Sequence, residues 1–241
     1  MLITPLTRAK LVELLPESLE IAEIGVASGE FSRRILEGCK PRRLRMIDAW
    51  AHQDVAHLKP DSNNPEQAVQ DSRHAQVLQD FAPEIASGRV VVERAFSHVA
   101  AERIADGSLD VVYIDADHSY DAVMRDLACY APKVAPGGLV MGHDYTLHPR
   151  VEFGVVRAVN DFVLANGYTF LALTTGENFP SWAIAAGLQG TAGVFMERIA
   201  SRVRNVVEVT GYPEDIAFEP KYVRHETKGV QFVPSFSAIR K

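Results

Sequence analysis

The stretch Ile21-Ala-Glu-Ile-Gly-Val-Ala-Ser-Gly-Glu-Phe-Ser32 decides the fold class of this chain. Most of its first six residues are apolar, as expected of a strand that is buried on both faces of a sheet. Gly25 and Gly29 stand four residues apart, and a segment with apolar residues at helical spacing begins at Glu30. A strand, a glycine loop and a helix in this order predict a cradle in which the backbone closely approaches a ligand.

The spacing of this loop distinguishes between two kinds of ligand. The sequence reads Glu-x-Gly-x-x-x-Gly from Glu23 to Gly29, whereas a dinucleotide pyrophosphate packs against Gly-x-Gly-x-x-Gly. A carboxylate two residues before Gly25 would repel a pyrophosphate and attract a cation. The loop therefore indicates a cationic ligand, and close packing of a strand against a helix is the alternative explanation for its glycines.

Composition and charge are typical of a globular protein with a sizeable core. The chain has 241 residues, of which 47% are hydrophobic and 23% are charged, and its formal net charge is −6. The negative charge and the lack of a basic run argue against nucleic-acid binding. We find no signal-peptide pattern, no apolar run of membrane-spanning length, and no disulfide or metal-binding spacing of Cys39 and Cys129. We therefore expect a cytoplasmic protein without a membrane partner.

Apolar runs that follow the glycine loop predict strands alternating with helices. Strands are expected at 44–48, 90–93, 109–114, 139–142, 168–173 and 181–186, and helices at 6–15, 66–81, 120–130 and 152–165. Pro136-Gly-Gly138 is expected to form a turn before the strand at 139–142. Alternation up to residue 167, and then two strands joined by a short loop, predict a doubly wound α/β fold whose sheet is mostly parallel with one antiparallel strand.

The composition changes after Gly187. Residues 191–204 are compatible with a helix, whereas 211–241 carry prolines, aromatic residues and charges without periodicity. We expect one domain over residues 1–187 and a C-terminal extension over 188–241 that serves as an arm, a lid or an oligomer contact. A homodimer or a higher homo-oligomer would follow from the last of these roles.

Polar residues follow several predicted strands at their carboxyl ends, where ligands bind in open α/β sheets. They are Glu23 and Gly25, then Asp48, then Asp115, Asp117 and His118, and finally His143 and Asp144. The two oxygens of Asp48 match the hydroxyls of a ribose, and capping of the next turn is the alternative. Ser97 follows the strand at 90–93 and is expected to meet an adenine ring or to cap the next helix.

The order of these motifs resembles that of the class I S-adenosylmethionine-dependent methyltransferases. The shared motifs are the Glu-x-Gly-x-x-x-Gly loop, the acid that ends the second strand, the Asp-x-Asp after the fourth strand and the Pro-Gly-Gly before the fifth, over residues 20–186. The resemblance implies a Rossmann-like fold with a seven-stranded sheet and S-adenosylmethionine as cofactor. The cofactor-binding residues that it implies are Glu23, Gly25, Gly29, Asp48, Ser97 and Asp115.

Two stretches look like a bacterial subgroup related to metal-assisted O-methyltransferases of catechols and antibiotic sugars. They read Ile-Asp-Ala-Asp-His-Ser-Tyr from Ile114 and Pro-Gly-Gly-Leu-Val-Met-Gly-His-Asp-Tyr from Pro136. In those relatives an Asp-Asp or Asp-Asn pair ends the fifth strand, whereas this chain has His143-Asp144. The resemblance implies a small hydroxylated substrate and a divalent metal bound by Asp115, His143 and Asp144.

The identity of the metal and the source of the base are left open by these residues. Two carboxylates suit Mg²⁺, and an imidazole ligand favours Mn²⁺, Fe²⁺ or Zn²⁺. Without a metal, His143 could itself accept the proton of the acceptor, with Asp115 as its catalytic partner. His143 and Asp144 can reach one site only if the strand has ended by residue 143, because neighbouring strand residues point to opposite faces. His118 is expected to start the next helix.

Two other functions fit parts of the pattern. A nicotinamide-dependent oxidoreductase uses a related sheet, but the loop spacing around Glu23 argues against it. A non-catalytic nucleotide-binding module would keep the cofactor pocket alone. Because Asp115, His143 and Asp144 form an acceptor-side set apart from the cofactor loop, we favour a methyltransferase enzyme.

Overall fold

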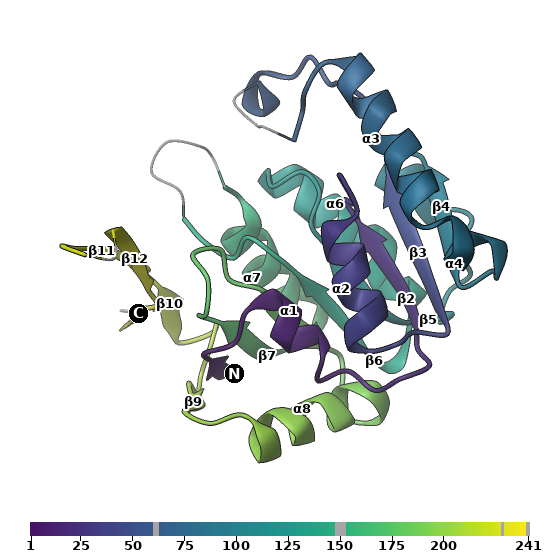
Figure 1. Cartoon of the computed structure of the whole chain (residues 1–241). Helices are drawn as coiled ribbons and strands as arrows, with labels where there is room; N and C mark the ends of the chain where they lie inside the picture. The colour runs from purple at the N-terminus through teal and green to yellow at the C-terminus, as the bar shows by residue number, and fades with distance from the viewer. Residues whose placement is uncertain (60–62, 148–152, 228, 240–241) are drawn as a thin grey trace.

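The computed structural model describes residues 1–59, 63–147, 153–227 and 229–239. A central sheet contains β1 (Leu2–Thr4), β2 (Glu20–Ile24), β3 (Arg43–Asp48), β4 (Val90–Arg94), β5 (Leu109–Ile114), β6 (Val134–Gly142), β7 (Thr169–Thr174), β8 (Trp182–Ala185) and β9 (Val207–Glu208). These nine strands are arranged in the order β4-β3-β2-β5-β6-β8-β7-β1-β9 (Figure 1).

The strand directions confirm the expected fold. Strands β4, β3, β2, β5 and β6 are parallel neighbours, and β8 runs antiparallel to both β6 and β7. These seven strands form the Rossmann-like sheet with its one antiparallel member. The sheet continues beyond them, because β1 pairs with β7 in parallel and β9 pairs with β1 in antiparallel orientation. Strands β1 and β9 have three and two residues, which is too short for a periodic sequence signal.

Helices cover both faces of the sheet (Figure 1). One apolar cluster contains residues of α1 (Arg8–Val12), α2 (Glu30–Gly38), α3 (Gln67–Asp80) and α8 (Gly190–Arg202). The other contains residues of α5 (Ser97–Ala101), α6 (Tyr120–Tyr130) and α7 (Val155–Asn166). The short helices η1 (Ala56–Leu58), α4 (Ala82–Ala86) and η2 (Ala131–Lys133) complete the set. Residue 152, the expected first residue of α7, lies outside the described residues.

The alternation of side chains along β2 explains why both faces are packed. Ile21 belongs to the cluster with α1 and α2, whereas Ala22 and Ile24 belong to the cluster with α6 and α7. All five residues of β2 are buried, Glu20 and Glu23 included, because helices cover both faces of this central strand.

The prediction of a turn at Pro136-Gly-Gly138 was wrong, because these residues lie within β6. Gly137 has a φ of 79°, and a Cβ atom there would lie 2.7 Å from the carbonyl oxygen of Gln189. The pairing of β5 with β6 shifts register between Leu109 and Val111. Gly137 thus lets β6 bend and pass close to the start of α8. The strand therefore begins at Val134 and not at the expected residue 139.

The last part of the chain is more regular than its sequence suggests. It forms two small antiparallel sheets, one of β10 (Ile216–Phe218) with β13 (Phe236–Ala238) and one of β11 (Lys221–His225) with β12 (Gly229–Val233). Helix α8 packs Phe195 and Ile199 into the same core as α1 and α2. The division into residues 1–187 and 188–241 stays a prediction. Within the described residues, no helix is long and apolar enough to cross a membrane.

The end of β2 lies in close contact with the end of β5. Gly25 has a φ of 91°, and a Cβ atom placed on it would lie 2.0 Å from the carbonyl oxygen of Asp115. The N–H of Gly25 donates to the carbonyl of Ile47 on β3. Only glycine can combine this conformation with this approach.

We expect Gly25→Ala to destabilise the fold by more than about 3 kcal/mol, because it adds a steric clash to an unfavourable backbone conformation. Gly88→Ala is the matched control, since Gly88 has a φ of 74° but a Cβ atom added to it would meet no heavy atom within 4 Å. The control should cost about 1–2 kcal/mol, the penalty of the left-handed conformation alone. Urea unfolding of both variants measures the difference, and equal losses would contradict the close contact.

Candidate active site

Asp48, at the end of β3, holds the glycine loop in place. One of its carboxylate oxygens accepts hydrogen bonds from the N–H groups of Val26 and Ala27, each at 2.9 Å, and the other accepts from the N–H of Trp50 at 2.7 Å. Ala27 and Trp50 have φ angles of 49° and 40°, a region that such residues rarely adopt. The Asp48 carboxylate therefore stabilises two unusual backbone conformations, and its contact with a ribose stays a prediction.

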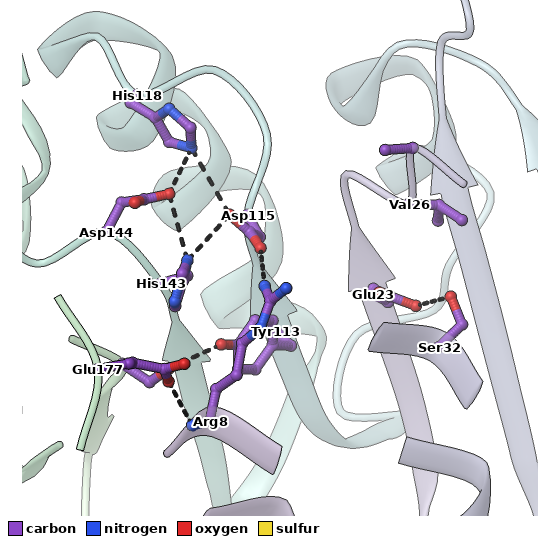
Figure 2. A network of polar contacts seen from close by, with 12 residues as sticks. Arg8, Glu23, Val26, Ser32, Tyr113, Asp115, His118, His143, Asp144 and Glu177 are labelled. Atoms are coloured by element: carbon purple, nitrogen blue, oxygen red, sulfur yellow. Dashed lines mark hydrogen bonds and ion pairs between the residues drawn. The ribbon is translucent and has the colours of Figure 1, made fainter. Parts of the chain in front are cut away.

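Glu23 points from β2 into the protein interior. Its side chain is 1% exposed and accepts a hydrogen bond from the hydroxyl of Ser32 on α2 (Figure 2). Burial raises the pKa of Glu23 to about 8, and the Ser32 hydrogen bond offsets only part of this effect. The carboxyl group is therefore protonated at neutral pH, and its predicted contact with a cofactor is not tested by this geometry.

Ser97 is the first residue of α5 and faces α6. Its hydroxyl donates to Asp126, and its carbonyl accepts a hydrogen bond of 2.8 Å from the hydroxyl of Tyr130. The residue that precedes α5 is Phe96, and no side chain caps this helix. Ser97 thus ties α5 to α6 at the end of β4, and its predicted contact with adenine stays a prediction.

The ends of β5 and β6 bring two carboxylates and two imidazoles together (Figure 2). Strand β6 ends at Gly142, and Asp144 has a left-handed φ of 57°, so that His143 and Asp144 turn toward the same place. His143 Nδ1 lies 3.3 Å from Asp144 Oδ2 and 3.7 Å from Asp115 Oδ1. The condition for convergence, that the strand ends by residue 143, is met.

His118 is the member of this cluster that sequence analysis missed. Its Nε2 lies 2.9 Å from Asp144 Oδ2 and 3.6 Å from Asp115 Oδ1, and its ring stacks on Phe153. His118 lies in the loop before α6, where the sequence pattern predicts only a helix-start residue. The spacing Asp115-x-x-His118 at the end of a buried strand is the signal that could have identified it.

The cluster fits a divalent metal ion. Among the described residues, Asp115, His118 and Asp144 form a group whose ligand atoms all lie within 4.8 Å of one another. Ligand bonds of about 2.0–2.2 Å would separate neighbouring ligand atoms by roughly 3–3.5 Å, similar to the distances in the cluster. The buried Nε2 of His118 is close to Asp144 but lacks a hydrogen-bond partner. His143 lies beside this group as a further nitrogen donor.

The contacts of His118 and His143 with the two carboxylates favour the protonated forms of both rings. Burial lowers the pKa of His118 and His143, but their contacts with Asp115 and Asp144 outweigh it, so that both pKa values are raised. For Asp144 burial acts to raise the pKa, and the two imidazoles lower it strongly. A cation that displaced these protons would meet the carboxylates of Asp115 and Asp144 in a partly buried site.

The sheet, the glycine loop and the acid at the end of the next strand together define the class I methyltransferase fold. Residues 22–145 match the model of a methyltransferase-domain family, and the chain belongs to this family. The matched region runs from β2 through Asp144 and includes the loop and Asp48. The resemblance to class I S-adenosylmethionine-dependent methyltransferases is thereby confirmed.

Solved structures share the fold at low sequence identity. A protein from Corynebacterium glutamicum is 17% identical over 76% of this chain and 79% of its own, with a TM-score of 0.50. A putative rRNA methylase from Clostridium thermocellum is 11% identical over 73% of this chain and 92% of its own, with a TM-score of 0.52. Spermidine synthase from Thermotoga maritima is 12% identical over 83% of this chain and 63% of its own, with a TM-score of 0.50. No curated protein sequence matches the chain.

Glu23→Gln should change how stability depends on pH. Below about pH 4.5 the carboxyl group is protonated in both the folded and the unfolded chain; above it, only the unfolded chain loses the proton until the pH reaches about 8. The contribution of Glu23 to stability therefore falls across this window, by on the order of 3–5 kcal/mol. Glutamine still accepts the Ser32 hydrogen bond but has no proton to lose, so this part of the decline should disappear.

Urea unfolding at a series of pH values measures this difference between Glu23→Gln and the wild type. Ser32→Ala is the control, because it keeps the carboxyl group and should retain the decline. A Glu23→Gln variant whose stability changes with pH as steeply as the wild type would show that Glu23 is ionised in the folded chain.

Proposed function

We propose that this chain transfers the methyl group of S-adenosylmethionine to a hydroxyl group of a small metabolite, with the help of a divalent cation. The family supports methyl transfer, and S-adenosylmethionine is the methyl donor that this family implies. The observation that carries the proposal is the group of Asp115, His118 and Asp144, which lies directly beside the glycine loop at the ends of β5 and β6.

The cofactor side consists of the loop and the residues around it. Gly25 and Gly29 give the backbone of the loop its close approach to the ligand, and Asp48 fixes the loop and offers its remaining acceptor capacity to the ribose. Glu23 lies beneath the loop, and Ser97 lies at the end of β4. Asp115 stands between this side and the acceptor side.

The acceptor side holds the cation and orients the substrate. Asp115, His118 and Asp144 would bind the ion, and His143 would support Asp144 from the other side. A divalent cation supplies positive charge that lowers the pKa of the acceptor hydroxyl. The mixture of carboxylate and imidazole donors favours Mn²⁺, Fe²⁺ or Zn²⁺ over Mg²⁺.

His143 is the proposed proton acceptor. When the methyl group moves from the sulfonium to the acceptor oxygen, the sulfur keeps the electron pair of the broken bond and the hydroxyl loses its proton. The nitrogen Nε2 of His143, which is free of hydrogen bonds within the described residues, can take this proton, while Nδ1 keeps facing Asp144 Oδ2 at 3.3 Å, and this carboxylate would stabilise the imidazolium that results. The raised pKa of His143 favours the protonated ring, so the ring must lose its own proton before it can act as the base, and a cation bound beside it would promote that loss.

Two other functions fit the site less well. A nicotinamide-dependent oxidoreductase would need a loop suited to a pyrophosphate, and the family assignment does not favour it. A non-catalytic nucleotide-binding module would bind the cofactor but transfer no methyl group. The paired acids and imidazoles beside the loop favour the enzyme, because a binding module would not need them.

The first test concerns the cofactor. Calorimetry should detect binding of S-adenosylhomocysteine and much weaker binding of NAD. Asp48→Ala should weaken S-adenosylhomocysteine binding by about 1–3 kcal/mol, because hydrogen bonds to a charged acceptor are lost. Clear binding of NAD without binding of S-adenosylhomocysteine would reject the proposal.

The second test concerns the cation. We expect His118→Ala and Asp144→Ala each to weaken calorimetric Mn²⁺ binding by at least about 100-fold, more than is typical for residues that merely support a ligand. His98→Ala is the control, because His98 is an exposed residue of α5. Methyl transfer to a panel of catechols and sugars should be lost in both variants and in the chelated wild type, whereas S-adenosylhomocysteine binding should persist. Transfer that survives chelation would reject the cation and leave His143 as the base.

A further inference from the structure

A groove runs between α1 and α2 and opens beside the glycine loop. Its volume is about 720 Å³, which lies in the range of small-molecule sites, and its lining includes Thr7, Arg8, Ser28, Gly29, Phe31 and Glu177. Ser28 and Gly29 belong to the glycine loop. The groove therefore reaches the place where the amino-acid end of the cofactor would lie, and α1 forms one of its walls.

Arg8 is one of the residues that line this groove, and its side chain is held by several contacts (Figure 2). Its Nη1 donates to Asp115 Oδ2 at 2.9 Å, and its guanidinium lies over the ring of Phe31, 4.7 Å from the centroid. Its backbone N–H donates to the carboxylate of Glu177 in the loop between β7 and β8. Contacts with Asp115 and Phe31 thus hold the guanidinium beside the loop, and the contact with Glu177 fixes the backbone of Arg8.

The guanidinium of Arg8 has donors to spare. A guanidinium carries five N–H groups, and in the described part of the chain the Arg8 side chain makes one hydrogen bond, to Asp115. Its side chain is 32% exposed. The other arginines that line the groove pair with carboxylates of their own, Arg33 with Glu84 and Arg34 with Glu37. Of the two carboxylates in contact with Arg8, that of Glu177 belongs to a residue that also lines the groove, whereas Asp115 contacts the guanidinium from outside the lining.

The cofactor ends in an amino-acid group with an ammonium and a carboxylate. Arg8 and Asp115 present the complementary pair of charges, 2.9 Å apart. We propose that this ion pair is the binding site for the amino-acid end of the cofactor. The guanidinium of Arg8 binds the carboxylate of the cofactor, and Asp115 Oδ2 binds its ammonium group. The inference rests on the proposed use of S-adenosylmethionine. It gives a function to a residue that precedes the region matched by the family model, 22–145.

Arg8 and Asp115 are paired with each other before the cofactor binds, and each would exchange this partner for a charged group of the cofactor. When the amino-acid end enters, one ion pair is replaced by two, so that no charge in this partly buried place loses its partner. A guanidinium binds a carboxylate through two parallel hydrogen bonds, and its planar shape suits this better than the point charge of lysine. Asp115 Oδ1 keeps facing His118 and His143, so the same carboxylate serves the acceptor side as well.

Binding of three ligands distinguishes the contribution of Arg8 to cofactor affinity from the contributions of other residues. They are S-adenosylhomocysteine, its decarboxylated analogue that keeps the ammonium, and 5′-methylthioadenosine, which lacks the amino-acid end. In calorimetry the wild type should bind S-adenosylhomocysteine about 10- to 100-fold more tightly than the decarboxylated analogue, as expected for a charged hydrogen-bonded contact. Arg8→Met should bind both equally, because methionine still covers Phe31 but has no charge. Arg8→Lys should restore part of the difference.

Arg33→Met is the matched control, since Arg33 lines the same groove and stacks on Phe81 in the same manner. It should keep the full preference for the carboxylate. In every variant the affinity for 5′-methylthioadenosine should be unchanged, which shows that the nucleoside site is intact.

Two results would overturn the inference while leaving the proposed function standing. The first is an Arg8→Met variant that still prefers S-adenosylhomocysteine to its decarboxylated analogue. The second is an equal loss of affinity for all three ligands, which would give Arg8 a purely structural role. A wild type that binds neither S-adenosylhomocysteine nor 5′-methylthioadenosine would overturn the proposed function, and the inference with it.

Discussion

The contact between Gly25 and the carbonyl of Asp115 determines how the two halves of the site meet. Because Gly25 has no side chain, the end of β2 can lie directly against the end of β5. The loop and Asp48 then lie on one side of this contact, and the cluster of carboxylates and imidazoles lies on the other. A methyl group carried by the loop and an acceptor held by the cluster would face each other across it, without any movement of the sheet.

Four of the acidic side chains at the carboxyl ends of the parallel strands are each compensated in a different way. Glu23 is buried and keeps its proton, while Asp48 accepts three backbone N–H groups. Asp115 pairs with a guanidinium, and Asp144 with two imidazoles. Four bare carboxylates in so small a region would repel one another strongly. Because each carboxyl group has a different partner, the chain can fold with all four of them close together.

Sequence patterns predicted the parts of this structure that depend on local order. The alternation of long strands with helices gave the parallel sheet, and the glycine spacing gave the loop between β2 and α2. His118 lies only three residues after Asp115, and that spacing could have identified it. Arg8 could not be assigned from a local pattern, because its place is set by how the chain returns to the sheet. Arg8 meets Asp115 across 107 positions, and no periodicity carries that information. The strands β1 and β9 were missed because they are too short for alternation to be visible.

Asp115 uses its two oxygens for two different neighbours: Oδ2 contacts Arg8, and Oδ1 faces the two histidines. A single rigid carboxylate is therefore shared by two binding events, and a rotation that improves one contact alters the other. Affinities linked in this manner are reciprocal. If a ligand on one side changes the affinity of the other side by some factor, a ligand on the other side changes the affinity of the first by the same factor. The total free energy of binding both ligands is then the same whichever binds first. The side chain of Asp115 couples the two sites.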